Sequence, residues 1–222
     1  MPALPFRFVL FDLDGTLIDP EEGICGSVRY ALSTFGIKRE AESLTSFIGP
    51  PLIDSFREQF GMDDAEAWKA VEAYRVHFAR EGVHQNTLYP HVTQLLYALR
   101  RAGATVALAT SKPEPYARQI LFERGIARFF DTVAGATMGG ARVEKAEVVA
   151  EALARLGNPP TTETAMAGDR KHDIEGARAA GMVSIGVAWG FAPAGEFEAA
   201  RPTHLARTMD DLGRLLGVQL QP

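Results

Sequence analysis

The 222-residue sequence is 46% hydrophobic and 23% charged, which is typical of a soluble globular protein and excludes a chain that is disordered throughout. Its 23 Lys and Arg residues against 28 Asp and Glu residues give a formal net charge of −5. This balance does not favour a nucleic-acid polymer as the main partner, because phosphate-backbone affinity depends on a basic surface.

Two features of the N-terminal part predict the compartment. Residues 1–5 contain two prolines and no long apolar segment, so they match neither a signal peptide nor a membrane span. The single cysteine, Cys25, cannot form an internal disulfide, which favours a reducing environment. We therefore expect a cytoplasmic protein without a membrane partner.

The first predicted strand ends in two carboxylates. The apolar run 8–11 is typical of a strand buried on both faces, and Asp12, Asp14 and Gly15 follow it. Carboxylates one residue apart in a strand converge, and a divalent cation is the usual reason to tolerate their repulsion. A simple Asp-Gly turn is the competing interpretation, but it leaves a buried pair of acids uncompensated. An EF-hand loop is excluded because its twelfth position is Gly23 and a strand precedes it.

The segment 19–87 shows helical patterns and no convincing strand. Apolar residues recur there at helical spacing, and a glycine follows each pattern. This predicts a small helical insertion, separate from what flanks it. We interpret the stripe Trp68, Tyr74 and Phe78 as core of this insertion in preference to a base-stacking platform. The predicted helices are residues 21–35, 50–60 and 63–81.

From residue 88 onward, short apolar strands alternate with helical patterns. This alternation predicts an α/β fold, a doubly wound parallel sheet covered on both faces, formed by residues 1–18 and 88–222. A short extended piece and a closing helix are expected within residues 203–216. Further strands are predicted at residues 105–109, 132–135, 164–167 and 183–187, and helices at residues 91–101, 113–124, 144–156 and 172–180.

Polar side chains follow these predicted strands, and in such sheets ligands bind beyond the carboxyl ends of the strands. The Thr110 hydroxyl and nearby backbone amides could cradle a phosphate, whereas Ser111 alone is better explained as a helix N-cap before Pro113. The candidate site residues at strand ends are Asp12, Asp14, Thr110, Ser111, Lys112, Asp169 and Asp173, with Lys145 opening the helix after the third strand.

The order of these residues resembles a known family. Asp12-Leu13-Asp14-Gly15-Thr16, a hydroxyl at Thr110 or Ser111, Lys145, and Gly168-Asp169-Arg170-Lys171-His172-Asp173 are similar to the four motifs of the haloacid dehalogenase (HAD) superfamily. The resemblance covers essentially the whole chain, and residues 19–87 match the position of that family's α-helical cap. It implies a HAD-like Rossmannoid core with an inserted cap, in the phosphatase branch that contains phosphoglycolate phosphatases and small bacterial 5′-nucleotidases.

The resemblance also implies roles for the acids and the lysine. Asp12 would attack phosphorus to form an aspartyl-phosphate, and Asp14 would act as general acid and then as general base. Lys145 would neutralise the phosphate and hold the Asp12 carboxylate. Mg²⁺ would be bound by Asp12, Asp169 and the backbone carbonyl of Asp14. Asp173 could bind the metal directly, bind it through water, or hold Lys145.

Other predicted contacts to phosphate or substrate are less specific. A loop around Gly49 is a candidate for selectivity by resemblance, although a plain connecting turn explains it equally well. The basic run from Arg170 to His172 is either a solvated loop or a contact to the anionic substrate, and we single out Arg170. His77, His84 and His91 have no metal-binding spacing, so structural or exposed positions are expected. The predicted phosphate and substrate contacts are Thr110, Ser111, Lys112, Gly49 and Arg170.

We therefore expect a Mg²⁺-dependent phosphomonoester hydrolase, monomeric or homodimeric, for a small phosphorylated metabolite. A 5′-nucleotide is the first candidate, because the motifs look most like the nucleotidase group, and phosphoglycolate is the alternative. A sugar-phosphate phosphatase, a phosphomutase and a non-catalytic binding module follow, although a binding module would usually lack a motif acid. A dehalogenase has no role for Asp14. The missing GxGxxG and GxxxxGK motifs disfavour a Rossmann oxidoreductase and a P-loop enzyme.

Overall fold

The fold is described from a computed structural model for residues 4–138 and 142–220, so the first three residues of the proline-containing N-terminus lie outside the described part. The chain divides into two compact units, one formed by residues up to Ile18 and from Leu88 onward, the other by Asp19–Thr87. It passes between them through β2 (Ile18–Asp19) and β3 (Thr87–Leu88), which pair with each other. These strands were not predicted, because two residues leave no periodic pattern.

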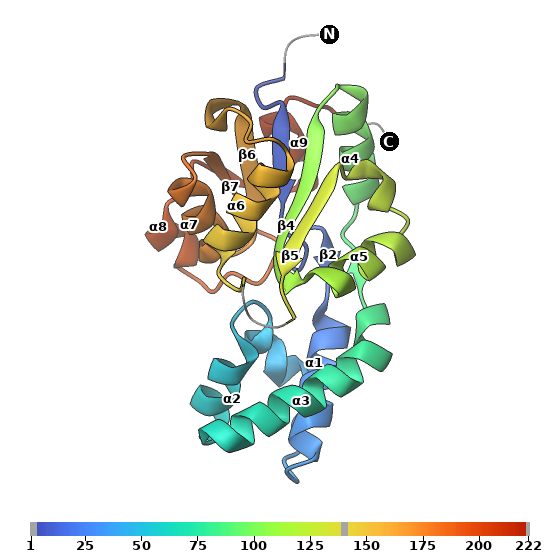
Figure 1. Ribbon diagram of the computed structural model, residues 1–222, viewed down its shortest axis with the longest axis vertical. Helices are drawn as coiled ribbons and strands as arrows, with labels where there is room; N and C mark the ends of the chain where they lie inside the picture. The colour runs from blue at the N-terminus through green and yellow to red at the C-terminus, as the bar shows by residue number, and fades with distance from the viewer. Residues whose placement is uncertain (1–3, 139–141, 221–222) are drawn as a thin grey trace. The chain divides into compact units, whose positions relative to one another are not determined.

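The first unit contains a six-stranded parallel sheet in the order β5-β4-β1-β6-β7-β8 (Figure 1). The sheet confirms the predicted doubly wound α/β class. β1 lies between β4 and β6, so the chain extends the sheet in both directions from its first strand. Successive residues Val9 and Leu10 point to opposite faces and both are fully buried, so both faces are covered. The strands are β1 (Phe8–Phe11), β4 (Thr105–Pro113), β5 (Thr132–Ala136), β6 (Thr164–Gly168), β7 (Val183–Val187) and β8 (His204–Ala206).

Helices cover this sheet near their predicted positions. On one face, Val149 of α6 and Ala177 of α7 pack against Leu10 and Met166 in the buried core. A five-residue helix, α8, was not predicted because it is too short to show helical periodicity. Among the described residues, no helix combines the length and apolar character needed to cross a bilayer. The helices are α4 (Val92–Arg101), α5 (Glu114–Glu123), α6 (Lys145–Arg155), α7 (Lys171–Ala179), α8 (Glu196–Ala200) and α9 (Met209–Leu215), with short 3₁₀ turns η3 (Ala127–Phe129) and η4 (Thr161–Glu163).

The second unit is helical. Phe47 and Phe56 lie in its core, with ring centroids 5.0 Å apart. Tyr74 and Phe78 are buried as predicted, but Trp68 is 51% exposed, so its assignment to the core was wrong. Trp68 lies roughly 120° around the helix from Tyr74, at the edge of the buried face. The elements are α1 (Glu21–Ser33), η1 (Ala41–Phe47), α2 (Leu52–Phe60), α3 (Asp64–Arg80) and η2 (Gly82–His84).

Candidate active site

Three carboxylates meet at the carboxyl ends of β1 and β6. Asp12 follows β1 and Asp169 follows β6, and the two strands are parallel neighbours. The Asp12 N–H donates to the Ala167 carbonyl at 2.9 Å, which fixes the residue beside the end of β6. Asp173 lies in the first turn of α7, and one carboxylate oxygen from each of the three acids lies within 4.8 Å of the others. All three side chains are buried, so the topology gathers acids from two strand ends in one place.

This group of acids is electrostatically suited to a divalent cation. Burial raises the pKa of Asp169 well above its ordinary value, and the charges of Asp173 and Asp12 raise it further. Burial also raises the pKa of Asp173 to about 6, against the opposing effect of Lys145. Buried carboxylates that repel one another are stabilised by a cation held between them, and carboxylate oxygens suit Mg²⁺. The residues present therefore fit a magnesium ion.

The backbone of two loops encloses the Asp169 carboxylate. Gly15 has a φ of 76°, which favours glycine, and a Cβ there would lie 2.1 Å from Asp169 Oδ2. A Cβ on Gly190 would lie 2.3 Å from the Asp169 Cβ. The Phe191 N–H donates to Asp169 Oδ2 at 2.8 Å. Only residues without a side chain fit at positions 15 and 190, which lets the backbone approach the acid closely.

Lys145, the first residue of α6, places its ammonium group between two of the acids. Its Nζ donates to Asp12 Oδ1 at 2.6 Å and to the Ala109 carbonyl at 3.1 Å, and it lies 2.8 Å from Asp173 Oδ1. Burial opposes the charge, but the neighbouring carboxylates outweigh it and raise the pKa of Lys145 above its ordinary value. Of the predicted roles for Asp173, holding Lys145 is the one for which the structure shows a contact.

Asp14 is paired with Lys112. The Lys112 Nζ lies 3.0 Å from Asp14 Oδ2, and both side chains are largely buried. Burial raises the pKa of Asp14, and the Lys112 charge offsets this in part. The other oxygen, Asp14 Oδ1, is buried and has no hydrogen-bond partner within residues 4–138 and 142–220. The sequence predicted a phosphate contact for Lys112 and missed its contact with this acid.

Thr110 and Ser111 lie on an extension of β4, which was predicted to end at residue 109 and instead continues to Pro113. Thr110 is buried, and its Oγ1 accepts the Lys112 N–H at 3.2 Å. Pairing with β5 changes register between Thr110 and Pro113, which indicates a bulge. Ser111 is exposed, and Pro113 occupies the N-cap position of α5, so the prediction that Ser111 caps this helix was wrong. The extended chain simply runs two residues further before the helix begins.

A family model described as haloacid dehalogenase-like hydrolase matches residues 9–187, which is most of the chain. The chain belongs to the haloacid dehalogenase-like hydrolase family. A 5′-nucleotidase of Pseudomonas aeruginosa is 40% identical over 96% of this chain and 97% of the relative. A solved structure from Clostridium difficile, described as that of a phosphatase, is 41% identical with a TM-score of 0.89, over 95% of this chain and 98% of the other.

A further relative carries a different name. The tyrosine-protein kinase PtkA of Mycobacterium tuberculosis is 40% identical over 96% of this chain and 73% of its own length. Its solved structure has a TM-score of 0.84, over 96% of this chain and 99% of the solved chain. With phosphatases among its relatives across nearly its whole length, the chain is an enzyme of this family's phosphatase branch.

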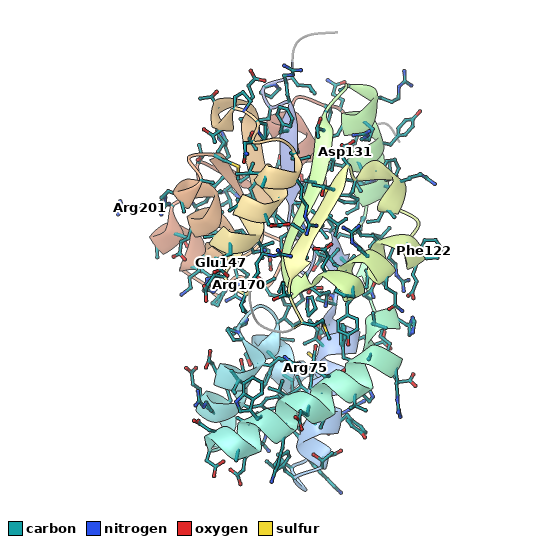
Figure 2. All side chains as sticks on the ribbon, viewed as in Figure 1. Arg75, Phe122, Asp131, Glu147, Arg170 and Arg201 are labelled. Carbon is teal, nitrogen blue, oxygen red and sulfur yellow. The ribbon has the colours of Figure 1, made fainter. Side chains whose placement is uncertain are left out.

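Arg170, which the sequence predicted to contact substrate, is labelled in Figure 2, and its side chain pairs with a carboxylate of this chain. Its Nε donates to Glu196 Oε1 at 3.0 Å, and its terminal nitrogen donates to Glu196 Oε2 at 3.2 Å. The two side chains are only 13% and 10% exposed. His172 is half-buried, and burial together with the charges of Lys171 and Arg170 lowers its pKa. The basic run is therefore not a uniformly solvated loop, and Arg170 has a carboxylate partner.

The remaining predicted residues lie elsewhere. Gly49 belongs to the helical unit, between η1 and α2, with a φ of 108°. His77 stacks on Tyr30 and lies 3.0 Å from the Ser27 hydroxyl, which is a structural position. Neither His77 nor His84 belongs to a metal-binding group in the described part of the chain.

Sequence reasoning missed the loop after β7. Trp189 Nε1 donates to the Thr16 carbonyl at 3.2 Å, and Gly190 and Phe191 contact Asp169 as described above. The sequence did contain a signal for this loop, because it follows β7, a parallel strand whose carboxyl end lies at the same edge of the sheet as those of β1 and β6. Applying the strand-end rule to the fifth predicted strand would have included these residues.

Proposed function

We propose that the protein is a Mg²⁺-dependent phosphomonoester hydrolase that acts through an aspartyl-phosphate on Asp12. The observation that carries this proposal is the arrangement around Asp12: Lys145 holds one of its oxygens at 2.6 Å, and Asp169 and Asp173 lie beside it. A carboxylate in this setting is oriented and ready to act as a nucleophile, while the ammonium group offsets the charge of an approaching phosphate.

In the first step, an Asp12 carboxylate oxygen forms a bond to phosphorus and the bond from phosphorus to the ester oxygen breaks. The protonated carboxyl of Asp14 gives its proton to that leaving oxygen, which departs as an alcohol. Lys112 holds the Asp14 side chain at 3.0 Å and so keeps the acid in one position. We assign the buried Thr110 hydroxyl to a phosphate oxygen, since its Oγ1 accepts the Lys112 N–H at 3.2 Å and its own proton remains to be donated.

In the second step, the Asp14 carboxylate takes a proton from water as the water oxygen attacks phosphorus. The bond between phosphorus and Asp12 breaks, which releases inorganic phosphate and restores both carboxyl groups. Asp12, Asp169 and the backbone carbonyl of Asp14 would hold Mg²⁺, which reduces the repulsion between the nucleophile and the phosphate dianion. Lys145 keeps its charge in the intermediate, because the Asp173 carboxylate still stabilises its ammonium form while Asp12 carries the phosphoryl group.

We propose a 5′-nucleotide as the first substrate to test. The motifs look most like the nucleotidase group, and the Pseudomonas relative named 5′-nucleotidase is 40% identical over nearly the full length of both chains. Phosphoglycolate is the alternative, since a relative from Aquifex aeolicus with the name phosphoglycolate phosphatase is 28% identical. We assign selectivity to the helical unit as the family's cap, with Gly49 as a candidate position.

The test is a panel of phosphorylated metabolites in Mg²⁺ buffer, with released phosphate as the measurement. The panel contains nucleoside 5′-monophosphates, 2-phosphoglycolate, hexose phosphates, pyrophosphate and ATP. We expect nucleoside monophosphates to give the highest kcat/KM. Asp12→Asn should reduce turnover by at least about 1,000-fold, because no other group can form the covalent intermediate. The exposed Asp210→Asn is the matched control and should behave as wild type.

Three results would contradict parts of this proposal. Substantial turnover in Asp12→Asn, well above the expected loss, would remove the nucleophile assignment, and full activity in EDTA would remove the metal. A higher kcat/KM for phosphoglycolate would favour the alternative substrate. Incubation with radiolabelled ATP and a tyrosine-containing acceptor peptide separates hydrolysis from transfer, because label on the peptide would indicate the kinase activity named for PtkA.

A further inference from the structure

The loop between β7 and α8 connects to both strand ends that carry the candidate acids. Trp189 donates its indole N–H to the Thr16 carbonyl in the turn after β1. Two residues later, the Phe191 N–H donates to Asp169 Oδ2 after β6 at 2.8 Å. The loop therefore contributes one of the hydrogen bonds that orient Asp169.

Between these two contacts, the loop backbone packs directly against the acid. A Cβ on Gly190 would lie 2.5 Å from Asp169 Oδ2 and 2.5 Å from the Gly15 carbonyl oxygen. There is no space for the loop to move toward the site without displacing the carboxylate. The position of Asp169 thus depends on how firmly the loop is held at its other end.

Glu196, the first residue of α8, holds that other end. Its Oε1 accepts the Lys171 backbone N–H at 2.8 Å and Arg170 Nε at 3.0 Å, and its Oε2 accepts a second Arg170 nitrogen at 3.2 Å. A bidentate pair between guanidinium and carboxylate fixes direction as well as distance. Glu196 therefore joins the end of the loop to the start of α7.

Arg170 carries this connection to the second acid. Its backbone N–H donates to Asp173 Oδ2 at 3.0 Å, while its side chain holds Glu196. Glu196 is thus linked to Asp173 through one residue, and to Asp169 through the loop. Both routes end on carboxylates of the three-acid group.

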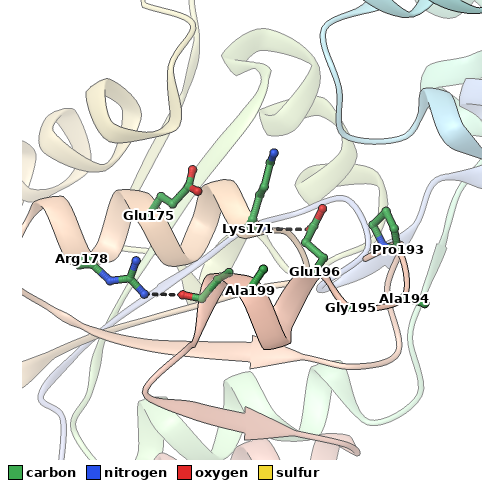
Figure 3. A pocket seen from close by; sticks show the side chains of 9 residues that line it. Lys171, Glu175, Arg178, Pro193, Ala194, Gly195, Glu196 and Ala199 are labelled. Carbon is green, nitrogen blue, oxygen red and sulfur yellow. Dashed lines mark hydrogen bonds between the residues drawn. The ribbon is translucent and has the colours of Figure 1, made fainter.

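Glu196 provides one of two groups of hydrogen bonds that join α7 to α8. A pocket of about 520 Å³ lies between α7 and α8, and Glu196, Lys171, Arg178 and Pro193 line it (Figure 3). At the other end of this pocket, Arg178 of α7 donates to the Ala200 carbonyl and, at 3.1 Å, to the Arg201 carbonyl. The hydrogen bonds of Glu196 provide the link at the N-terminal turn of α7.

We infer that Glu196, paired with Arg170, is a positioning residue that holds Asp169 and Asp173 in the geometry that binds the metal ion. The inference rests on the proposed function, since it requires that these acids bind Mg²⁺. A purely structural role would be limited to stabilising the first turn of α7, where a carboxylate is favourable in any case. If Glu196 positions the acids, its removal weakens metal binding, whereas removal of a purely structural residue leaves the metal affinity unchanged.

The experiment measures Mn²⁺ binding to the full-length protein by the electron paramagnetic resonance signal of free Mn²⁺, since oxygen-ligand sites that bind Mg²⁺ also accept Mn²⁺. Glu196→Ala should weaken the affinity by about 10- to 100-fold, the usual effect of removing a group that orients a metal ligand. Glu196→Gln should have a smaller effect, because its amide oxygen can still accept the Lys171 N–H. Glu198→Gln, an exposed acid on the same helix, is the control and should match wild type.

Two further measurements separate positioning from stability. The Mg²⁺-induced rise in Tm should shrink in Glu196→Ala, and the Mg²⁺ concentration for half-maximal rate should increase by a larger factor than kcat falls. Arg170→Ala should act in the same direction, and the double variant should be no worse than the more severe single variant, because the two side chains act as one unit.

The outcomes distinguish this inference from the proposed function. If wild type fails to bind Mn²⁺, the proposed metal site is wrong and the inference falls with it. If wild type binds Mn²⁺ and both Glu196 variants bind it equally well, with only a lower Tm, Glu196 is a structural residue and the inference alone is overturned. Glu196→Gln keeps the size of the side chain, so it provides a folded variant even where Glu196→Ala unfolds.

Discussion

Two groups of charged side chains in the first unit differ in balance and exposure. The strand-end cluster, which holds the candidate site, has four carboxylates and two ammonium groups, all largely buried. The Glu114 cluster has two carboxylates and three guanidinium groups, with side chains from 19% to 53% exposed. The first consists of Asp12, Asp14, Asp169, Asp173, Lys112 and Lys145, and the second of Glu114, Glu151, Arg118, Arg142 and Arg155.

The difference between the two clusters shows how a ligand-binding site can be distinguished from a structural network of ion pairs. In the Glu114 cluster each carboxylate has guanidinium partners, and the arrangement needs no further ligand. In the strand-end cluster the buried acids outnumber the bases, so an additional cation would offset their repulsion. Burial, like-charge excess and close backbone approach point to binding, whereas ion pairs alone do not.

The largest contrast is expected for removal of one base from each cluster. Lys145→Met leaves Asp12 and Asp173 buried without their cation, and breaking a buried pair in this way costs about 3–5 kcal/mol. Arg155→Met, in the exposed cluster, should cost about 1 kcal/mol or less. Urea unfolding of both variants in EDTA measures the difference. Similar losses for the two variants would show that burial does not separate the clusters.

Close backbone approach at the strand-end cluster gives the second effect. Gly190→Ala places a methyl group 2.3 Å from the Asp169 Cβ, and relieving that overlap should cost about 1–3 kcal/mol. Gly26→Ala is the control, because its Cβ would lie 3.7 Å from the nearest atom, an ordinary contact. Thermal unfolding gives the stabilities, and phosphate release gives the activity. Wild-type stability in Gly190→Ala would mean that the loop can move away from the acid.

How much of the strand-end cluster the sequence could predict depends on how far apart in the sequence the contacting residues lie. The buried runs that form β1 and β6 could be recognised locally, and the strand-end rule then placed Asp12, Asp169 and Lys145 at one edge. The pairing of Lys112 with Asp14 was not predictable, because it depends on the β4 bulge, which no local pattern reveals.

The same reasoning applies to Glu196. Its partner Arg170 lies 26 residues away in sequence, and α8 is too short to leave a periodic signal. A carboxylate on such a segment is indistinguishable from a solvated surface charge until the packing is known. Contacts between different loops are therefore the part of the site that could not be predicted from the sequence and became visible only in the structure.

Removing an excess acid should stabilise the metal-free protein. Asp169→Asn eliminates a buried charge whose pKa is raised by burial and by the neighbouring acids, and we expect a gain of roughly 0.5–2 kcal/mol in EDTA at pH 8. The same variant should lose the rise in Tm that Mg²⁺ gives wild type. Differential scanning fluorimetry with and without Mg²⁺ tests both points. A destabilised variant in EDTA would indicate that Asp169 is compensated without a cation.

The smallest effect is expected at the Glu114 cluster, and its dependence on pH has a defined sign. Burial raises the Glu114 pKa, but the hydrogen bonds from Arg155 and Arg118 outweigh this and lower it below the ordinary value of 4.5. A lowered pKa in the folded state gives stability that is present above pH 4.5 and lost as the pH falls through the folded-state pKa. Glu114→Gln should therefore reduce the free energy of unfolding at pH 7 by about 1 kcal/mol or less.

Below pH 4.5 the difference between Glu114→Gln and wild type should shrink, because protonated Glu114 no longer attracts the guanidinium groups. Glu72→Gln on the exposed side of α3 is the control and should show no such convergence. The raised pKa of Asp169 has the opposite sign, since a carboxylate of that kind destabilises the metal-free protein as the pH rises. If the free energies of unfolding of Glu114→Gln and wild type differ by the same amount from pH 7 to about pH 3, the Glu114 ion pairs contribute nothing to stability. The ion network on this surface would then be a result of the fold and not a source of its stability.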